Sequence, residues 1–152
     1  MLSIGPITVK KTNAVDFEVR IRTNIDSNIP PLSLNAPQMS KSLQNIIENA
    51  LDAVWDYSKN EQNEDEYIPE IVVSVERKES DIETLVSDNG PGISESIEER
   101  IFEPFFRTKP TGLGLSFSYD IITQIHEGQL KFESEQGSGT SFMITLPIPK
   151  IA

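Results

Sequence analysis

The first readable pattern in the chain is an alternation of apolar and charged residues over positions 17–22. A period of two over six residues predicts a half-buried β-strand. Shortly after it, Pro30 and Pro31 lead into an apolar stretch at Leu32 and Leu34, which predicts a second, short strand at a sheet edge. Residues 1–13 carry little pattern, so they give no prediction.

The strongest helical pattern covers residues 36–58. Asn35 or Ser40 is a suitable cap, and Pro37 suits a first helical turn. Apolar residues recur at helical spacing and predict one buried stripe, made of Leu43, Ile47, Ala50, Leu51 and Val54. The polar residues Asn45, Asn49 and Asp52 follow one another at i, i+4 and i+7, so we expect them on a second, shared face of this helix.

The rest of the chain alternates strands with one further long helix. After a polar loop at 59–66, we predict strands at 71–75 and 82–86, a short helix at 94–101 capped by Ser94, and an irregular segment at 102–111. A helix at 114–126, ended by Gly128, precedes strands around 130–132 and 141–146 with a turn at 137–139. The expected buried residues of that helix are Leu115, Tyr119, Ile122 and Ile125.

This order of elements predicts an α/β fold. We expect a two-layer sandwich in which one mixed, mostly antiparallel sheet carries helices on one face. The chain has 152 residues, which is the length of a single domain, so residues 1–152 are assigned to one domain.

The amino-acid composition excludes several classes of function. Acidic residues outnumber basic ones, 24 to 13, and the net charge of −11 repels phosphate backbones, so we expect no nucleic-acid partner. With no cysteine, the sequence has neither disulfides nor thiol chemistry. No apolar run approaches the roughly 20 residues that cross a bilayer. We therefore expect a cytoplasmic domain without direct membrane contact, whose parent protein could still be membrane-anchored.

The stretch V-S-D-N-G-P-G-I at residues 86–93 is the first candidate for chemistry. Asn-Gly and Pro-Gly both favour turns, and an ordinary turn is the simplest interpretation of this stretch by itself. However, Asp88 ends an apolar run, where a carboxylate can accept a hydrogen bond from the exocyclic amino group of adenine. Gly90 and Gly92 would allow the backbone to pass close to a flat base.

Other polar residues have two interpretations each. The amides of Asn45 and Asn49 suit a hard cation or a phosphate, or else form a solvated helix face. Gly112 and Gly114 precede a helix whose first N–H groups suit phosphates, although the spacing is neither a Walker nor a Rossmann pattern. Lys109, close before them, is either a terminal-phosphate contact or a surface charge.

Two residues in the C-terminal half of the chain, Thr140 and His126, are further candidates for a functional role. Thr140 belongs to a predicted hairpin turn and could reach a base through a water. His126 is the single histidine, and a cationic or capping role at its helix end is expected. One histidine argues against a metal cluster or a Ser-His-Asp triad.

Five motifs in order make the chain resemble the catalytic and ATP-binding domain of bacterial sensor histidine kinases, within the GHKL superfamily of gyrase, histidine kinase and MutL-type ATPases. The resemblance covers about residues 17–148. It is carried by L-Q-N-I-I-E-N-A at 43–50 (N box), D-N-G-P-G at 88–92 (first glycine box), I-F-E-P-F-F at 101–106 (F box), G-L-G-L at 112–115 (second glycine box) and G-S-G-T at 137–140.

This resemblance implies a Bergerat-type sandwich that binds ATP and Mg²⁺, with a loop lid over the nucleotide. It implies Asp88 on the adenine amino group, Asn45 and Asn49 on Mg²⁺ and the phosphates, and Lys109 near the terminal phosphate. Gly112 and Gly114 would form the phosphate-side hinge of the lid. The remaining expected nucleotide contacts are Gly90, Gly92, Ile93, Phe106, Leu113, Leu115 and Thr140.

Position 45 separates branches of this superfamily. The gyrase and MutL branches resemble one another in having a glutamate there that activates water, whereas an amide cannot accept a proton as a general base. Asn45 therefore favours phosphoryl transfer to a residue over hydrolysis. Glu48, beside Asn49, is the candidate base that polarises the incoming nucleophile.

The sequence departs from the family pattern at the lid, where only Pro110 and Thr111 separate Lys109 from Gly112. His126 lies where relatives often have His-Gly-Gly, so it is not expected to accept phosphate. We expect the catalytic domain of a two-component sensor histidine kinase, monomeric as this stretch, that phosphorylates a histidine on a separate dimerisation domain and thereby serves a response regulator. The alternatives are a nucleotide-binding interaction module without catalysis and an anti-sigma-type serine kinase.

Overall fold

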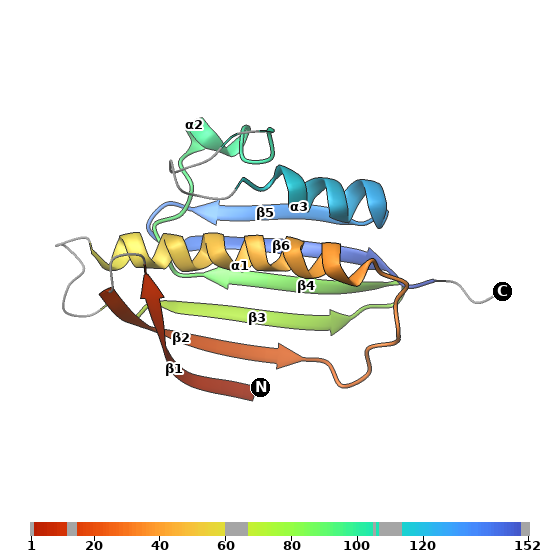
Figure 1. The fold of residues 1–152 in the computed structure, drawn as a ribbon, viewed down its shortest axis with the longest axis horizontal. Helices are drawn as coiled ribbons and strands as arrows, with labels where there is room; N and C mark the ends of the chain where they lie inside the picture. The colour runs from red at the N-terminus through yellow and green to blue at the C-terminus, as the bar shows by residue number, and fades with distance from the viewer. Residues whose placement is uncertain (1, 12–14, 60–66, 105, 107–113, 150–152) are drawn as a thin grey trace.

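The computed structural model describes residues 2–11, 15–59, 67–104, 106 and 114–149. Six strands form a single sheet in this part of the chain, in the order β1-β2-β3-β4-β6-β5 (Figure 1). The strands are β1 (Leu2–Lys11), β2 (Val15–Ile25), β3 (Glu70–Arg77), β4 (Asp81–Asp88), β5 (Gln129–Glu135) and β6 (Gly139–Pro147). Strands β2 and β3 are parallel and the other neighbours antiparallel, so the mixed, mostly antiparallel sheet is confirmed.

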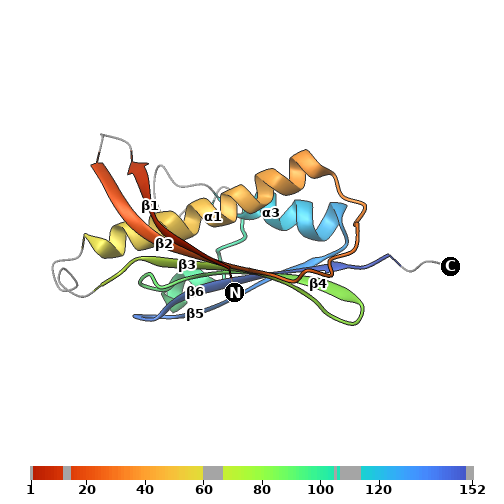
Figure 2. The same ribbon diagram turned by 90° about the horizontal axis from the view of Figure 1, so that it is seen from below.

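The long helix α1 (Ala36–Ser58) crosses the sheet, and α3 (Ser116–Asp120) lies on the same face (Figure 2). A π-helical turn, η2 (Ile121–Ile125), continues α3, and the short α2 (Glu95–Glu98) lies near the β5 edge. The two-layer α/β sandwich is therefore confirmed. The predicted lid falls on residues 107–113, outside the described residues.

Helix α1 begins as its sequence predicts. The Asn35 side chain accepts a hydrogen bond from the Gln38 N–H, and proline occupies the first turn. Its buried stripe lies slightly to one side of the predicted one: Met39, Ile46, Ala50 and Val54 are buried, whereas Leu43, Ile47 and Leu51 are only partly buried. The stripe is centred on Ile46 because α1 packs against both the sheet and α3, and the Ser118 hydroxyl donates to the Ser42 carbonyl across that contact.

The core lies between α1, α3 and the sheet. Its fully buried side chains come from every layer of the sandwich and include Val19, Ile46, Val54, Ile71, Val86, Ile122 and Ile144. Burying apolar side chains of this size contributes roughly 1.5–3 kcal/mol each. This packing holds the C-terminal end of β4 against the middle of α1.

Three local predictions were wrong. Residues 32–34 form no strand, and residues 2–11, which gave no prediction, form β1 instead. The Gly5–Pro6 pair interrupts the alternation of β1, and its register with β2 shifts between Ile4 and Pro6. Proline is tolerated there because β1 is an edge strand, which leaves one side of its backbone unpaired.

The second correction concerns the helix predicted at 114–126. It begins at Ser116 and widens into the π-helical turn η2 at its end, which rotates the last residues, so Ile125 is 56% exposed rather than buried. The third concerns the helix predicted at 94–101, of which only α2 forms. Ser94 occupies the cap position of α2, but its hydroxyl bonds to Ser96 instead of a backbone N–H.

Candidate functional site

A cavity of about 240 Å³ opens between α1 and the C-terminal end of β4. Helix α1 supplies one polar wall, the segment after β4 supplies the floor, and apolar side chains close the far side. The lining residues are Asn49, Asp52, Ala53, Asp56, Asp88, Pro91, Gly92, Ile93, Ile97, Ile101, Leu115, Thr140 and Phe142.

Asp88 is the central polar group of this cavity. Its side chain is only 9% exposed, and its Oδ1 accepts a hydrogen bond of 2.8 Å from the Gly90 N–H. Burial raises the pKa of the Asp88 carboxyl from its ordinary value to about 6, while bonds from the Gly90 and Thr140 backbone N–H groups oppose that rise. At neutral pH the carboxyl is therefore mostly ionised, and it can accept a further hydrogen bond.

Two glycines allow the chain to pack tightly around Asp88. Gly92 has a φ of 81°, and a Cβ there would lie 2.4 Å from the Glu135 carbonyl. Gly139 has a φ of 119°, and a Cβ there would lie 2.0 Å from the Asp88 carbonyl. Both positions combine a left-handed backbone with a close approach, so only glycine fits without rearrangement.

A hydroxyl network fixes the floor beside Asp88. The Ile93 N–H donates to Ser134 Oγ at 2.6 Å, and Ser134 Oγ lies 2.9 Å from Thr140 Oγ1. Thr140 pairs with Asp88 across the β4/β6 ladder. The network thus connects three predicted contact residues, because it joins Ile93 to Thr140, and Thr140 pairs with Asp88.

The predicted asparagines on α1 lie in different environments. Asn49 lines the cavity, and its Nδ2 donates to the Asn45 carbonyl one turn earlier at 2.8 Å. Asn45 does not line the cavity: it is 4% exposed, and its Oδ1 is buried without a hydrogen-bond partner among the described residues. Glu48 instead faces outward, where Gln44 Nε2 donates to its carboxylate at 3.0 Å.

The other predicted contacts are placed as follows. Leu115 is buried in the cavity wall, whereas Gly90 is buried behind Asp88 and outside the lining. Phe106 packs against the core, and its ring lies 4.7 Å from the Arg100 guanidinium carbon. A Cβ on Gly114 would lie 3.1 Å from the Phe106 carbonyl. The remaining predicted residues, Lys109, Gly112 and Leu113, lie outside the described residues.

Sequence reasoning missed several lining residues. Asp52 was expected on the face of Asn49 but not named as a site residue, and Asp56 follows Asn49 at i+7, so the same helical spacing identifies both as cavity residues. Ile97, Ile101 and Phe142 had no such signal, because their approach depends on the packing of α2 and β6.

His126 has a specific role away from the cavity. Its Nε2 accepts the Asn35 N–H at 2.9 Å, and its Nδ1 lies 2.8 Å from the Ile121 carbonyl. Only a neutral imidazole protonated at Nδ1 satisfies both contacts, because an acceptor nitrogen cannot carry a proton. The predicted capping role fits this geometry, whereas the cationic alternative does not.

Comparison with known proteins identifies the family. A model described as "Histidine kinase-, DNA gyrase B-, and HSP90-like ATPase" matches residues 36–150. The chain belongs to this family. Within it, Sporulation kinase E of Bacillus subtilis (strain 168) is 35% identical over 134 residues, which cover 86% of this chain and 16% of that protein.

Solved structures of family members agree with the fold. The nucleotide-free catalytic domain of histidine kinase ThkA matches with a TM-score of 0.68 and 28% identity, over 84% of this chain and 78% of that one. ThkA in complex with response regulator protein TrrA matches with a TM-score of 0.60 and 26% identity, over 84% of this chain and 34% of that one. The chain spans 16% to 22% of the length of the first curated relatives. No described helix has the length and apolar character of a membrane span.

Proposed function

We propose that this chain is the ATP-binding catalytic domain of a two-component sensor histidine kinase. In this proposal the γ-phosphate of ATP is transferred to a histidine on a separate dimerisation domain. The observation that carries it is the buried Asp88 carboxylate, which has one oxygen held by the Gly90 N–H and lines a cavity that is bordered by Asn49 of α1.

The base end of the cavity suits adenine. The Asp88 carboxylate would accept a hydrogen bond from the 6-amino group, which guanine lacks at that position. Ile93, Leu115 and Phe142 provide apolar surface for the faces of the base. Thr140 Oγ1 lies beside Asp88 and, through a water, would bond a ring nitrogen.

The phosphate end would lie along α1, where Asn45 and Asn49 are separated by one turn. A buried amide oxygen without a partner is costly, by roughly 1–3 kcal/mol, and Asn45 Oδ1 is in that position among the described residues. An amide oxygen is a suitable ligand for Mg²⁺, so these residues fit the metal. When bound, Mg²⁺ would neutralise phosphate charge during phosphoryl transfer.

The two α1 side chains would then position rather than transfer protons. Asn45 cannot act as a general base, because a neutral amide does not accept a proton at ordinary pH. The contact that Asn49 makes with the Asn45 carbonyl restrains the Asn49 side chain beside the cavity. Glu48 remains our proposed base toward the incoming histidine, and reaching it would require the Glu48 carboxylate to leave Gln44. Lys109 is proposed to contact the terminal phosphate.

The partners follow from the same proposal. They are a histidine-bearing dimerisation domain, as phosphate acceptor, and a response regulator, as the protein served by the phosphohistidine. The ThkA catalytic domain, which shares this fold, has been solved within a complex with response regulator TrrA. We propose a monomer for this stretch and a cytoplasmic location for the domain.

The experiment supplies the chain with ATP, Mg²⁺ and a purified dimerisation domain from a similar kinase. Transfer of phosphate to that domain in an acid-labile form, lost when its histidine is replaced, is the expected result. Nucleotide binding with no transfer to any supplied acceptor would instead favour a binding module. Acid-stable transfer to a serine would favour a serine kinase.

A further inference from the structure

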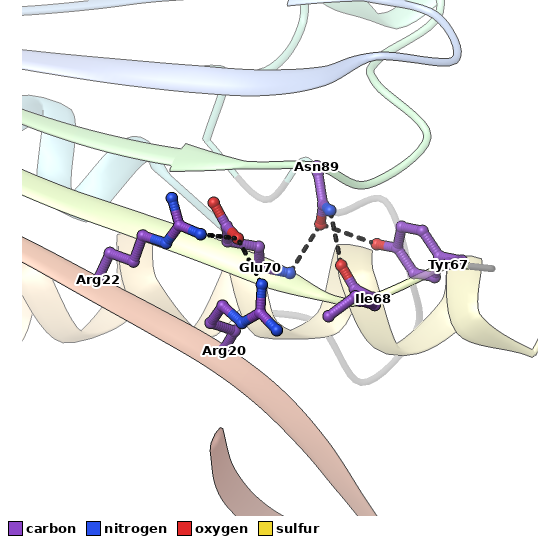
Figure 3. Close-up of polar contacts among 6 residues, drawn as sticks. All are labelled: Arg20, Arg22, Tyr67, Ile68, Glu70 and Asn89. Carbon is purple, nitrogen blue, oxygen red and sulfur yellow. Dashed lines mark hydrogen bonds and ion pairs between the residues drawn. The ribbon is translucent and has the colours of Figure 1, made fainter. Parts of the chain in front are cut away.

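Asn89 follows Asp88 directly but does not line the cavity, and its side chain points toward the segment that precedes β3 (Figure 3). Its Oδ1 accepts hydrogen bonds from the Glu70 N–H at 2.8 Å and from the Tyr67 hydroxyl at 3.1 Å. Its Nδ2 donates to the Ile68 carbonyl at 2.8 Å. The Asn89 backbone N–H adds a fourth bond, to the Glu70 carbonyl at 3.2 Å.

These bonds extend the sheet beyond its last backbone pair. The β3/β4 ladder ends where Ile71 pairs with Asp88. One residue later, the Asn89 amide takes the place of a peptide group, because it accepts from the N–H of residue 70 and donates to the carbonyl of residue 68. A carboxamide supplies both the donor and the doubly used acceptor of this geometry without carrying a charge.

These four hydrogen bonds between Asn89 and residues 67–70, here called the Asn89 clamp, restrain the residues that form the cavity floor. With residue 89 held at both its backbone and its side chain, the peptide units on either side of it have little freedom. One of those units carries the Gly90 N–H that holds Asp88 Oδ1. Gly90 is also confined, since a Cβ there would lie 2.9 Å from Asp88 Oδ1 and 3.1 Å from the Ala53 Cβ.

We infer that Asn89 is a positioning residue for base recognition: by clamping the chain to residues 67–70, it aims the Gly90 N–H at Asp88 and so orients the carboxylate oxygen that meets the adenine amino group. This inference rests on the proposed function for its nucleotide part. Its structural part, the control of the Gly90 N–H by Asn89, stands on the hydrogen bonds alone.

The neighbouring ion pairs provide a matched control. The Glu70 carboxylate lies 3.6 Å from Arg22 and 4.0 Å from Arg20, on the other side of the backbone that Asn89 binds (Figure 3). Glu70→Gln removes that charge and leaves the backbone N–H and carbonyl of residue 70 in place. Ion pairs that are partly exposed, as these are, contribute little to stability, so we expect this variant to leave the hydrogen bonds of Asn89 intact.

The experiment compares wild type, Asn89→Ala, Asn89→Asp and Glu70→Gln. Amide hydrogen exchange at Gly90 is measured by NMR, with Ile144 in β6 as the internal reference. Affinities for ATP and for inosine triphosphate, which lacks the 6-amino group, are measured by calorimetry. Asn89→Asp keeps the size of the side chain and replaces the donor to Ile68 by a carboxylate oxygen that repels the Ile68 carbonyl, so it carries the test if Asn89→Ala does not fold.

In the Asn89 variants we expect Gly90 exchange to accelerate at least about fivefold relative to Ile144, because a local bond is lost. The preference for ATP over inosine triphosphate should shrink by a similar factor, while Glu70→Gln behaves as wild type. Unchanged Gly90 exchange, or an equal loss of affinity for both nucleotides, would overturn the inference. If wild type binds neither nucleotide, the proposed function fails, and Gly90 exchange still decides the role of Asn89.

Discussion

Two asparagines that lie next to the candidate site, without lining its cavity, have opposite surroundings. The Asn89 side chain, at the end of β4, makes three hydrogen bonds to residues 67–70. The Asn45 side chain, on α1, is more deeply buried, yet its Oδ1 has no partner among the described residues. The proposed base end of the site is thus organised by hydrogen bonds within the protein, whereas the proposed metal end retains a buried acceptor without a partner among the described residues.

The difference concerns stability as well as binding. A paired carboxamide stabilises the fold, and an unpaired buried one destabilises it, because water is lost without replacement. Destabilising polar groups persist in proteins mainly at functional sites. The pattern therefore supports the two proposals, Asn45 as a metal ligand and Asn89 as a structural support for Asp88.

The largest expected effect comes from Asp88→Asn, which keeps the shape of the side chain and removes its charge. We expect ATP affinity to fall at least about tenfold, since hydrogen bonds to a charged group contribute about 1.5–3 kcal/mol. Titration of a fluorescent ATP analogue, with and without Mg²⁺, measures this. Affinity equal to that of wild type would mean that Asp88 does not meet the base.

The pH dependence gives the second prediction. Burial raises the folded-state pKa of Asp88 from 3.8 to about 6, because the folded protein favours the protonated carboxyl. The stability that this carboxyl contributes is therefore fully present below pH 3.8 and is lost as pH rises through about 6, where Asp88 ionises in the folded protein. The unfolding free energy of Asp88→Asn minus that of wild type should therefore increase by about 2–3 kcal/mol between pH 4 and pH 8. Urea unfolding from pH 4 to pH 8 tests this.

ATP binding should show the opposite trend with pH, because only the ionised carboxylate accepts from the amino group efficiently. Wild-type affinity should rise between pH 5 and pH 7 with a midpoint near 6, whereas Asp88→Asn should lack this step. A wild-type affinity that is constant over this range would argue that burial does not raise the pKa of Asp88.

The comparison itself is tested by making the same substitution at both asparagines. Asn45→Leu should raise the free energy of unfolding by about 1 kcal/mol while removing the Mg²⁺ dependence of ATP binding. Asn89→Leu should lower it by about 2 kcal/mol, because the Glu70 N–H and the Ile68 carbonyl lose their partner. Thermal unfolding of both variants gives the sign of each change in the free energy of unfolding. Two changes of the same sign would contradict the proposed contrast between Asn45 and Asn89.

The smallest effect is expected at His126, which connects α1 to η2 outside the cavity. His126→Ala removes the acceptor for the Asn35 N–H and the donor to the Ile121 carbonyl, and should lower the free energy of unfolding by about 1 kcal/mol. Urea titration provides the value. Nucleotide affinity should remain that of wild type, and its loss would show that this contact reaches the site.

Much of the site could be predicted because its motifs are local. The turn around Gly90 and Gly92 and the shared face of Asn49 and Asp52 depend on residues within a few positions of one another. Asn89 could not be predicted, since its side-chain partners lie 19 to 22 residues earlier in the chain. The orphaned oxygen of Asn45 could not be predicted either, because helical spacing places it on a face without showing what covers that face.

By itself, the sequence determined the helix α1 with two candidates for its cap, the alternation of β2, the β-branched strands β3 and β4, the turn glycines and the order of the family motifs. These features depend on short-range sterics and on periods of 2 and 3.6 residues, which a single sequence displays directly. The tertiary structure decided that residues 2–11 pair with β2, that β2 and β3 are parallel, and that Asp88 faces Thr140 across the sheet. Such pairings join residues distant in sequence, and their register follows from the packing of the whole core.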